Sequence, residues 1–484
     1  MVKTLPTKPI KLVSLLLGPA LFLVINLLPV PELLTPLAWK VISVAVWMIT
    51  WWTTETVPLP VTALIPLLLF PLLGIFEIKE AAASYAHPVI FLFMGGFMIA
   101  LGLEKRNLHL RIALNLIKIT GTHPNGIVLG FMLSTAFISM WISNTATTVM
   151  MLPIAMSVIG LLKAEQERQA AKSFRRFALS LLLGIAYAAN IGGAMTIIGT
   201  PPNVVSIAYV RDLLDIDLTF TSWLIIGFPV GSLLIAATFF LMTRVIYPSG
   251  LKSFEASEKL IHDKINTLGK ISREEIAVAV VFAITALCWI MRQPLNNLIG
   301  TNVLNDTIIA MAGGVAMFIL PVNIKKGEYL VDWESTKNLP WGILILFGGG
   351  ICLARGLESS GLVQFIGELI AGQREINVWL LVLIFTTITL LMTEIMSNVA
   401  LIVIFIPVVI AICQGFGYDP LLSVIPATLS ASYAFMMPVS TPPNAIVFSS
   451  GYIKIREMMV IGVLLNIIAI ATLMLTAYFL PGYF

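Results

Sequence analysis

Residues 140–153 of the chain read MWISNTATTVMMLP and lie inside a segment, 125–162, that carries no charged residue. The segment is long and apolar enough to cross a bilayer, yet basic residues flank both of its ends. These are Lys105, Arg106, Arg111 and Lys118 before it and Lys163, Arg168, Lys172, Arg175 and Arg176 after it. A single crossing would place one basic cluster outside, against the tendency of Lys and Arg to stay in the cytoplasm. We therefore predict a re-entrant hairpin that enters and leaves from the cytoplasm, with Ser143-Asn144-Thr145 at its tip.

A second copy of this stretch follows 254 residues later. The same offset relates Ser143 to Ser397, Asn144 to Asn398, Pro153 to Pro407, and residues 95–104 to residues 349–358. The motif Thr-Pro-Pro-Asn also occurs twice, at 200–203 and at 441–444. The sequence therefore predicts two diverged halves of one ancestral unit.

The second half is predicted to have the opposite orientation in the membrane. Residues 377–414 make a second hairpin whose flanks are only weakly basic, which suits entry from the outer face. Inverted repeats with helices broken near the bilayer midplane are typical of secondary transporters. The Gly-Gly pairs that begin at Gly95 and Gly349 are interpreted as points of close helix packing.

The composition excludes a soluble protein. Charged residues make up 11% of the 484 residues and hydrophobic residues 58%, whereas an ordinary soluble domain has roughly 25% charged residues. A net charge of +4 without a basic, aromatic-rich stretch also argues against nucleic-acid binding. We predict an all-α polytopic membrane protein with about 11 transmembrane helices plus the two hairpins, its N-terminus cytoplasmic and its C-terminus outside. This threading keeps most of the 29 basic residues in the cytoplasm.

The predicted organisation alternates two kinds of unit. In order, these are 1–124, the first-repeat scaffold helices; 125–247, the first hairpin, a broken helix and the following helix, assigned to a transport domain; 248–274, a cytoplasmic linker; 275–376, the second-repeat scaffold helices; and 377–484, the second hairpin, a broken helix and the last helix, again in the transport domain.

The broken helices predict an anion site. Ser, Thr and Asn are good helix N-caps, and proline suits the first helical turn, so both hairpin tips and both Thr-Pro-Pro-Asn motifs should start helices in mid-membrane. Helix N-termini present free N–H groups and a partial positive charge. No Lys or Arg occurs in 126–162, 177–210 or 376–453. A co-bound cation would therefore supply the missing charge, and hydroxyl, amide and carbonyl oxygens are ligands suited to Na⁺.

Other interpretations remain open at this point. Glu394, three residues before Ser397, either serves the site or only caps a local helix end. An anion channel would also need midplane breaks, whereas a membrane enzyme would need a nucleophile paired with a base. Glu394 beside Ser397 is the only intramembrane candidate near the motifs for that chemistry, so an enzyme is not favoured.

The residues of these motifs resemble one known family. Residues 140–148 and 199–203, with Ser397-Asn398 and Thr441-Pro442-Pro443-Asn444 in the second half, are similar to the divalent-anion/sodium symporter family of dicarboxylate and citrate carriers. The likeness extends over essentially the whole chain. It implies a homodimer in a bacterial inner or plasma membrane that works by an elevator motion, with Na⁺ as coupling ion and no organic cofactor. It also implies substrates such as succinate, malate, fumarate, α-ketoglutarate or citrate.

The resemblance further assigns site residues by position. One Na⁺ site would use Ser139, Ser143, Asn144 and Gly199, and the other would use Thr393, Met396, Asn398 and Ser440. The substrate carboxylates would meet Ser143, Asn144, Thr145 and Thr200 from one half and Ser397, Asn398, Val399, Thr441 and Pro442 from the other.

One departure from the family pattern concerns Val399. Many members have Thr there, so this chain lacks one hydroxyl on that side of the site. The departure bears on which di- or tricarboxylate is preferred. The family also contains sodium-independent exchangers, so antiport is the alternative to Na⁺ symport.

Overall fold

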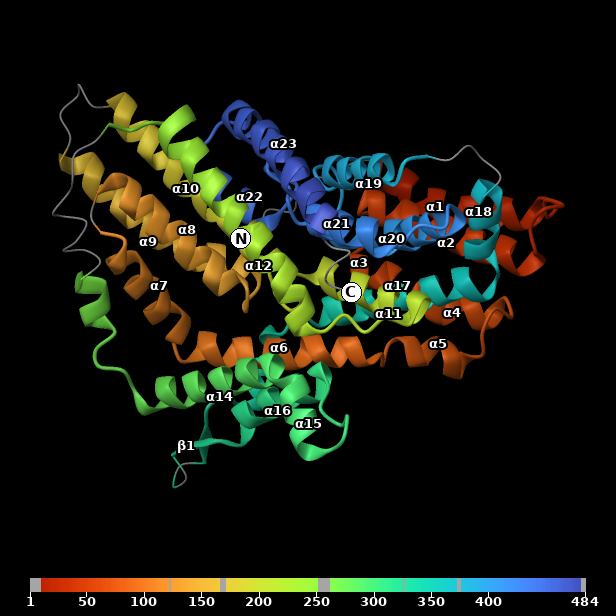
Figure 1. The fold of residues 1–484 in the computed structure, drawn as a ribbon, viewed down its shortest axis with the longest axis horizontal. Coiled ribbons are helices and arrows are strands. Elements are labelled where there is room, and N and C mark those ends of the chain that lie inside the picture. Colours follow the sequence, from red (N-terminus) through yellow and green to blue (C-terminus); the bar gives the residue numbers. More distant parts are fainter. Residues whose placement is uncertain are drawn as a thin grey trace.

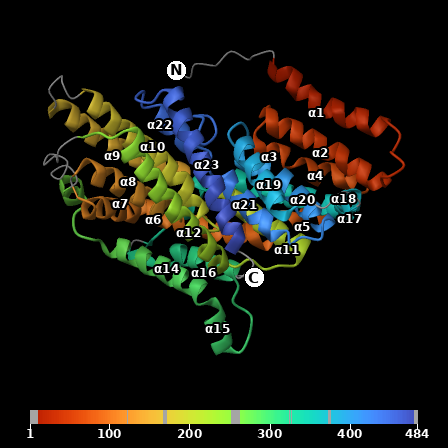
Figure 2. The same ribbon diagram turned by 45° about the horizontal axis from the view of Figure 1, so that its top comes forward.

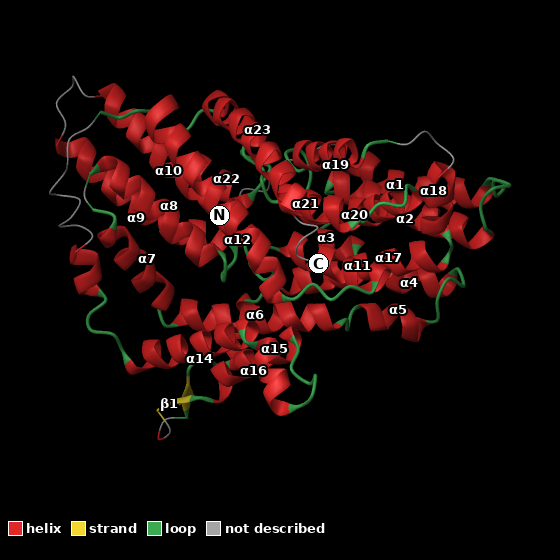
Figure 3. Cartoon of the chain, viewed as in Figure 1, coloured by secondary structure: helices red, strands yellow, loops and turns green. Residues whose placement is uncertain are grey.

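The computed structural model describes residues 10–121, 123–165, 171–250, 262–323, 325, 327–371 and 376–479. Part of the predicted linker 248–274 and both chain ends lie outside these ranges, so the sides of the membrane assigned to the termini stay predictions. The described chain is helical almost throughout, with one short antiparallel ribbon of β1 (Pro321–Asn323) and β2 (Glu328–Tyr329) (Figure 3).

The first half opens with helices assigned to the scaffold and continues into the first hairpin and broken helix. The helices are α1 (Ile10–Leu27), α2 (Pro36–Thr54), α3 (Leu59–Thr62), α4 (Ile65–Leu72), α5 (Ile78–Ser84), α6 (Pro88–Lys105), α7 (Leu108–Ile119), α8 (Pro124–Ser139), α9 (Asn144–Glu165), α10 (Ala171–Ala194), α11 (Pro201–Leu214) and α12 (Phe220–Phe240), which ends in a π-helical turn, η2 (Leu241–Ile246).

The second half contains the ribbon, a 3₁₀ helix and further α-helices. Its helices are α14 (Arg273–Ile290), α15 (Arg292–Ile299), α16 (Asp306–Ile319), the 3₁₀ helix η4 (Trp333–Asn338), α17 (Trp341–Ser359), α18 (Leu362–Ala371), α19 (Val378–Met392), α20 (Asn398–Gly415), α21 (Leu421–Ala431), α22 (Pro442–Phe448) and α23 (Ile455–Phe479).

Six of the described helical spans are long and apolar enough to cross a bilayer. They cover 78–105, 173–194, 220–246, 341–359, 398–415 and 455–479, and α14 with α15, bent by 77°, would make a seventh if counted as one span. Seven shorter apolar helices of 10–17 residues accompany them, among them both limbs of the first hairpin and α19 of the second. The helical membrane-type fold is thus confirmed, whereas the predicted 11 crossings and the re-entrant course of the hairpins stay predictions.

The helices break where the motifs lie. In the first half the chain leaves helical geometry between α8 and α9, at residues 140–143, and between α10 and α11, at 195–200. In the second half it does so between α19 and α20, at 393–397, and between α21 and α22, at 432–441. α11 and α22 both begin with proline at the first turn, where the missing N–H has no intrahelical partner to lose. The predicted positions of all four breaks are confirmed.

The two halves interlock through the helices that restart after the breaks. α22, from the second half, packs on α9 and α10 of the first, and α11, from the first half, packs on α20 and α21 of the second. In Figure 1, α8, α9 and α10 lie on the left with α22 beside α10, whereas α18, α19 and α20 lie on the right with α11 below α20. Figure 2 also shows α22 near α9 and α10, and α11 near α20. Both hairpins and both broken helices therefore form one packed unit.

Glycines allow some of the helices assigned to the scaffold to approach closely. A Cβ on Gly95 of α6 would lie 2.5 Å from the backbone of Ala310 on α16, and one on Gly349 of α17 would collide with the backbone of Ala63. Backbones this close leave no room for a side chain. The interpretation of the two Gly-Gly pairs as packing points is confirmed.

Candidate functional site

At the first break, oxygen atoms gather around Ser139. Its Oγ lies 2.7 Å from Asn144 Oδ1 and 2.8 Å from the carbonyl oxygen of Ala189 on α10. A hydroxyl has one hydrogen and can donate to only one of these acceptors at a time. A hydroxyl, an amide oxygen and a carbonyl therefore meet on the inner side of the hairpin tip, and this donor set suits Na⁺.

The second break repeats the arrangement. Thr393 Oγ1 lies 2.7 Å from Asn398 Oδ1 and 2.5 Å from the carbonyl oxygen of Ala431 on α21. Thr393 and Asn398 are the residues that the offset of 254 pairs with Ser139 and Asn144. The two halves thus build the same triangle of a hydroxyl, an amide oxygen and a carbonyl, although their sequences have diverged.

The break between α10 and α11 is tied to the first tip. Thr196 Oγ1 lies 2.5 Å from the Met140 carbonyl oxygen and accepts a hydrogen bond from Gly199 N at 3.0 Å. A Cβ on Gly193 would lie 2.8 Å from Asn144 Nδ2 and closer still to Oδ1. Thr196 and Gly193 thus connect the segment that carries Gly199 to the first tip, where Ser139 and Asn144 lie. The contact of Gly199 with an ion stays a prediction.

The break between α21 and α22 is held by Glu394, a carboxylate only 5% exposed. Its two oxygens accept hydrogen bonds from Phe435 N, Met436 N and Met437 N at 2.8–3.2 Å, and Oε1 also accepts from Asn466 Nδ2 at 3.2 Å. These are backbone N–H groups of an unwound segment, which would otherwise lack partners. Glu394 thus fastens the second tip to the break that carries Ser440 and Thr441.

The remaining residues predicted for the second Na⁺ site lie on these same two segments. Met396 is half-buried on the tip. Ser440 donates through Oγ to the Met437 carbonyl at 2.6 Å, within the break that Glu394 binds. Asn444 keeps this break in shape by donating to the carbonyls of Ala434 at 2.9 Å and Met437 at 3.1 Å. The direct contact of Met396 and Ser440 with an ion stays a prediction.

The caps at the four helix starts differ from the expectation in two places. Ser143 Oγ accepts from Ala146 N at 3.2 Å, and Thr441 Oγ1 accepts from Asn444 N at 3.4 Å, so these two side chains cap their helices as predicted. Ser397 and Thr200 make no side-chain cap hydrogen bond, so that part of the prediction is wrong. Because the Ser397 side chain does not fill this position, the first N–H groups of α20 are available to a ligand. At α11 the first two residues are Pro201 and Pro202, which carry no N–H group.

The hairpin tips are accessible to solvent, whereas Thr200 and Thr441, which precede α11 and α22, are buried. Thr145 and Pro442 are exposed, and both Thr200 and Thr441 are only 4% exposed. The other predicted contacts, Ser143, Asn144, Ser397, Asn398 and Val399, are half-buried. The tips therefore reach the surface of the packed unit, and the hydroxyls of the two threonines lie below it. This arrangement suits a small polar ligand that enters from one side.

One residue of this region was missed by sequence reasoning. Asn190, on α10, points its amide at the second break and donates from Nδ2 to Thr441 Oγ1 at 3.1 Å. Tyr187, one turn earlier, donates to the Phe435 carbonyl at 2.9 Å. The available signal was a lone amide in the uncharged part of α10, three residues before Gly193.

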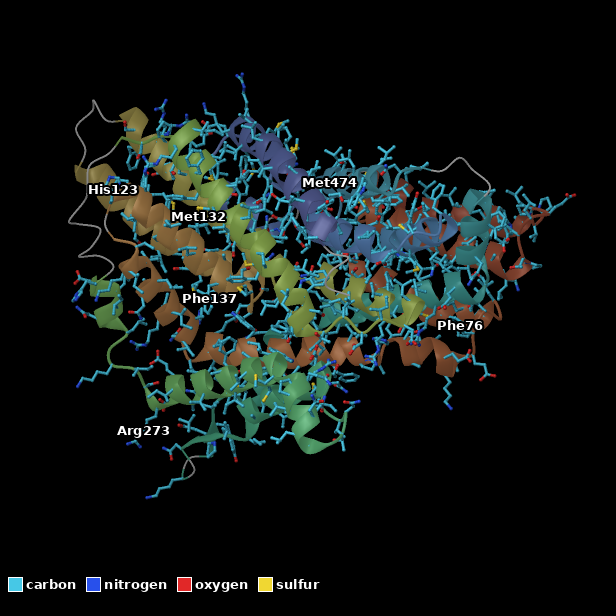
Figure 4. All side chains as sticks on the ribbon, in the orientation of Figure 1. Phe76, His123, Met132, Phe137, Arg273 and Met474 are labelled. Atoms are coloured by element: carbon cyan, nitrogen blue, oxygen red, sulfur yellow. The ribbon has the colours of Figure 1, made fainter. Side chains whose placement is uncertain are left out.

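The donor chemistry excludes a transition-metal type of site in the described part of the chain, where no group of three or more His, Cys, Asp or Glu could hold a metal ion. The oxygens at the two tips come instead from Ser, Thr, Asn and the backbone. Figure 4 shows the side chains that fill the space between the helices, with Met132 and Phe137 labelled on α8 and Met474 on α23.

Comparison with known proteins places the chain among transporters. A family model described as the sodium:sulfate symporter transmembrane region matches residues 10–480. The sodium-dependent dicarboxylate transporter SdcS of Staphylococcus saprophyticus is 38% identical over 475 residues, which cover 97% of this chain and 91% of that protein. SdcS of Staphylococcus aureus (strain USA300) is 37% identical with the same coverage.

Two solved structures share the fold at low sequence identity. The YdaH transporter of Alcanivorax borkumensis matches with a TM-score of 0.54 and 13% identity, covering 84% of this chain and 87% of that one. MtrF of Neisseria gonorrhoeae, described as one of a class of antimetabolite efflux pumps, matches with a TM-score of 0.53 and 12% identity over 83% of each chain. At these identities the likeness concerns the fold alone.

Proposed function

This chain belongs to the sodium:sulfate symporter family of membrane transporters, and we propose that it couples the entry of Na⁺ to the uptake of a C4 to C6 di- or tricarboxylate. The observation that carries the proposal is the repeated triangle of hydroxyl, amide oxygen and carbonyl at Ser139–Asn144 and Thr393–Asn398. Relatives of 37–38% identity that are sodium-dependent dicarboxylate transporters support both the ion and the substrate class.

In this proposal, cations and helix N-termini together hold the dianion. The first Na⁺ binds at Ser139, Ser143, Asn144 and the Gly199 carbonyl, and the second binds at Thr393, Asn398 and the carbonyls of Met396 and Ser440. The substrate carboxylates accept hydrogen bonds from the two triplet tips, with Thr200, Thr441 and Pro442 lining the pocket. Each Na⁺ offsets negative charge where the surrounding segments offer no Lys or Arg.

The proposed transport mechanism is an elevator motion of one packed unit. The unit consists of both hairpins, both broken helices, α12 and α23, and it slides against a scaffold built from 1–124 and 275–376 in a homodimer. The interlocking of α22 with α9 and α10, and of α11 with α20 and α21, supports a unit that moves as one body. The opposite orientation of the two halves in the membrane is part of the same proposal.

The proposed activity is tested by uptake of labelled succinate into proteoliposomes. An inwardly directed Na⁺ gradient should drive concentrative uptake, and replacing Na⁺ by K⁺ or choline should abolish it. Competition by unlabelled malate, fumarate, α-ketoglutarate, citrate and sulfate would then rank the substrates. Uptake that needs internal dicarboxylate and no Na⁺ would replace symport by exchange, and single-channel currents would indicate a channel.

Gly193→Ala is expected to weaken Na⁺ binding at the first site. The added Cβ would collide with the Asn144 side chain and displace Oδ1 from Ser139. Because groups that orient a metal ligand typically contribute a factor of about 10–100 in affinity, we expect the Na⁺ concentration for half-maximal uptake to rise by about 10-fold or more. Gly160→Ala on α9 is the matched control, since its Cβ would meet no atom within 4 Å. Equal Na⁺ dependence in the two variants would contradict this view of the first site.

A further inference from the structure

We propose that Asn190 is a positioning residue that orients the Thr441 hydroxyl to donate to a substrate carboxylate. The inference rests on the proposed function. It states that Asn190, from the first half of the chain, supports the substrate contact made by Thr441, from the second half. Asn190 is only 1% exposed and lies on α10, opposite the break between α21 and α22.

The orientation of the Asn444 amide is settled by its neighbours. Its Nδ2 lies 2.9 Å from the Ala434 carbonyl and 3.1 Å from the Met437 carbonyl. Two carbonyl oxygens can only accept, so the –NH₂ group must face them and Oδ1 must face the other way. That oxygen lies 3.3 Å from Asn190 Nδ2.

The orientation of the Asn190 amide follows from Asn444. Asn190 Nδ2 lies 3.3 Å from Asn444 Oδ1, 3.3 Å from the Ala434 carbonyl and 3.1 Å from Thr441 Oγ1. The first two atoms can only accept, so Asn190 must present its –NH₂ group to all three. Thr441 Oγ1 is therefore an acceptor in its contact with Asn190.

Thr441 is left with one free hydrogen. Its Oγ1 accepts from Asn190 Nδ2 at 3.1 Å and from Asn444 N at 3.4 Å, which uses both lone pairs of the hydroxyl oxygen. The hydroxyl hydrogen must then point away from Asn190 and Asn444. Thr441 directly precedes the exposed Pro442 at the start of α22, so a donor fixed in this way is well placed for a carboxylate oxygen.

Two further observations separate this role from simple packing. Asn190 Oδ1 is buried without a hydrogen-bond partner, which costs free energy and offsets part of the stability contributed by the contacts of Nδ2. No equivalent contact from the second half to Thr200 of the first half is found among the described residues. The carbonyls of Ala189 and Ala431 are equivalent in the two triangles, so Ser432 is the counterpart of Asn190, and its hydroxyl has no partner.

The test is a double-mutant cycle on succinate uptake at saturating Na⁺. Asn190→Ala should raise the succinate KM by about 10-fold, since a hydrogen bond to a charged group is involved, with the Na⁺ dependence unchanged. Thr441→Val should raise the KM at least as much, and adding Asn190→Ala to Thr441→Val should raise it no further. Tyr187→Phe removes another bond from α10 to the same break, at Phe435, and should keep the wild-type KM.

The outcomes distinguish the inference from the function on which it rests. Additive effects of Asn190→Ala and Thr441→Val on KM, or an effect of Asn190→Ala on Vmax alone, would overturn the role of Asn190 while wild-type uptake stands. Wild-type protein without Na⁺-driven dicarboxylate uptake would overturn the proposed function itself. Asn190→Ser, whose side chain is too short to reach Thr441, provides the same comparison if the alanine variant does not fold.

Discussion

Asn144→Ala and Asn398→Ala are each expected to abolish Na⁺-driven dicarboxylate uptake. Each asparagine places its Oδ1 2.7 Å from the hydroxyl of its triangle, Ser139 in one half and Thr393 in the other. In the proposed site, alanine removes a cation ligand and a substrate contact together. Groups that only orient a metal ligand contribute a factor of about 10–100 in metal affinity. Because these asparagines would be ligands themselves, we expect uptake efficiency, measured as Vmax/KM in proteoliposomes, to fall by at least about 100-fold.

The control for these variants is Asn115→Ala. Asn115 lies exposed on α7 and donates only to the Arg111 carbonyl one turn earlier, so its loss should leave uptake unchanged. All three proteins should elute as folded, monodisperse species of the same size in detergent. Full uptake by either Asn144→Ala or Asn398→Ala would refute the assignment of the site to the hairpin tips.

Glu394→Ala is expected to destabilise the fold and to stop transport. The change leaves the N–H groups of Phe435, Met436 and Met437 and the Asn466 amide without their buried acceptor. A buried polar group that loses its partner costs about 1–3 kcal/mol, so the unwound segment should lose its shape. A lower midpoint of thermal unfolding in detergent and loss of succinate uptake would be the measured results.

Glu394→Gln separates geometry from charge at this position. Its Oε1 can still accept from part of the unwound segment, whereas its –NH₂ group faces a donor, so its unfolding midpoint should lie between wild type and alanine. Glu368→Ala, an exposed change on α18, should match the wild type. A wild-type midpoint for Glu394→Ala would show that the break between α21 and α22 keeps its shape without the carboxylate.

Much of the candidate site could be predicted because helix breaks are local events. Ser-Asn-Thr and Thr-Pro-Pro-Asn stop and restart helices through caps and through the missing N–H of proline, so their positions show in the sequence. The constant offset of 254 then paired the two tips. The caps predicted at Ser397 and Thr200 failed because a side chain able to cap does so only where the backbone turns its hydroxyl toward the free N–H groups.

The sequence by itself therefore determined the class of the molecule, its four helix breaks and the hydroxyl and amide residues at each tip. Only the tertiary structure decided what Glu394 and Asn190 do. The sequence left Glu394 open between a site residue and a local cap, and its partners proved to be N–H groups 41–43 residues away. Asn190 reaches Thr441 across 251 residues, from the other half. The Glu394 contacts arise where α19 packs on α21, and the Asn190 contact arises where α22 packs on α10. Both depend on how distant segments meet rather than on the neighbouring residues in the sequence.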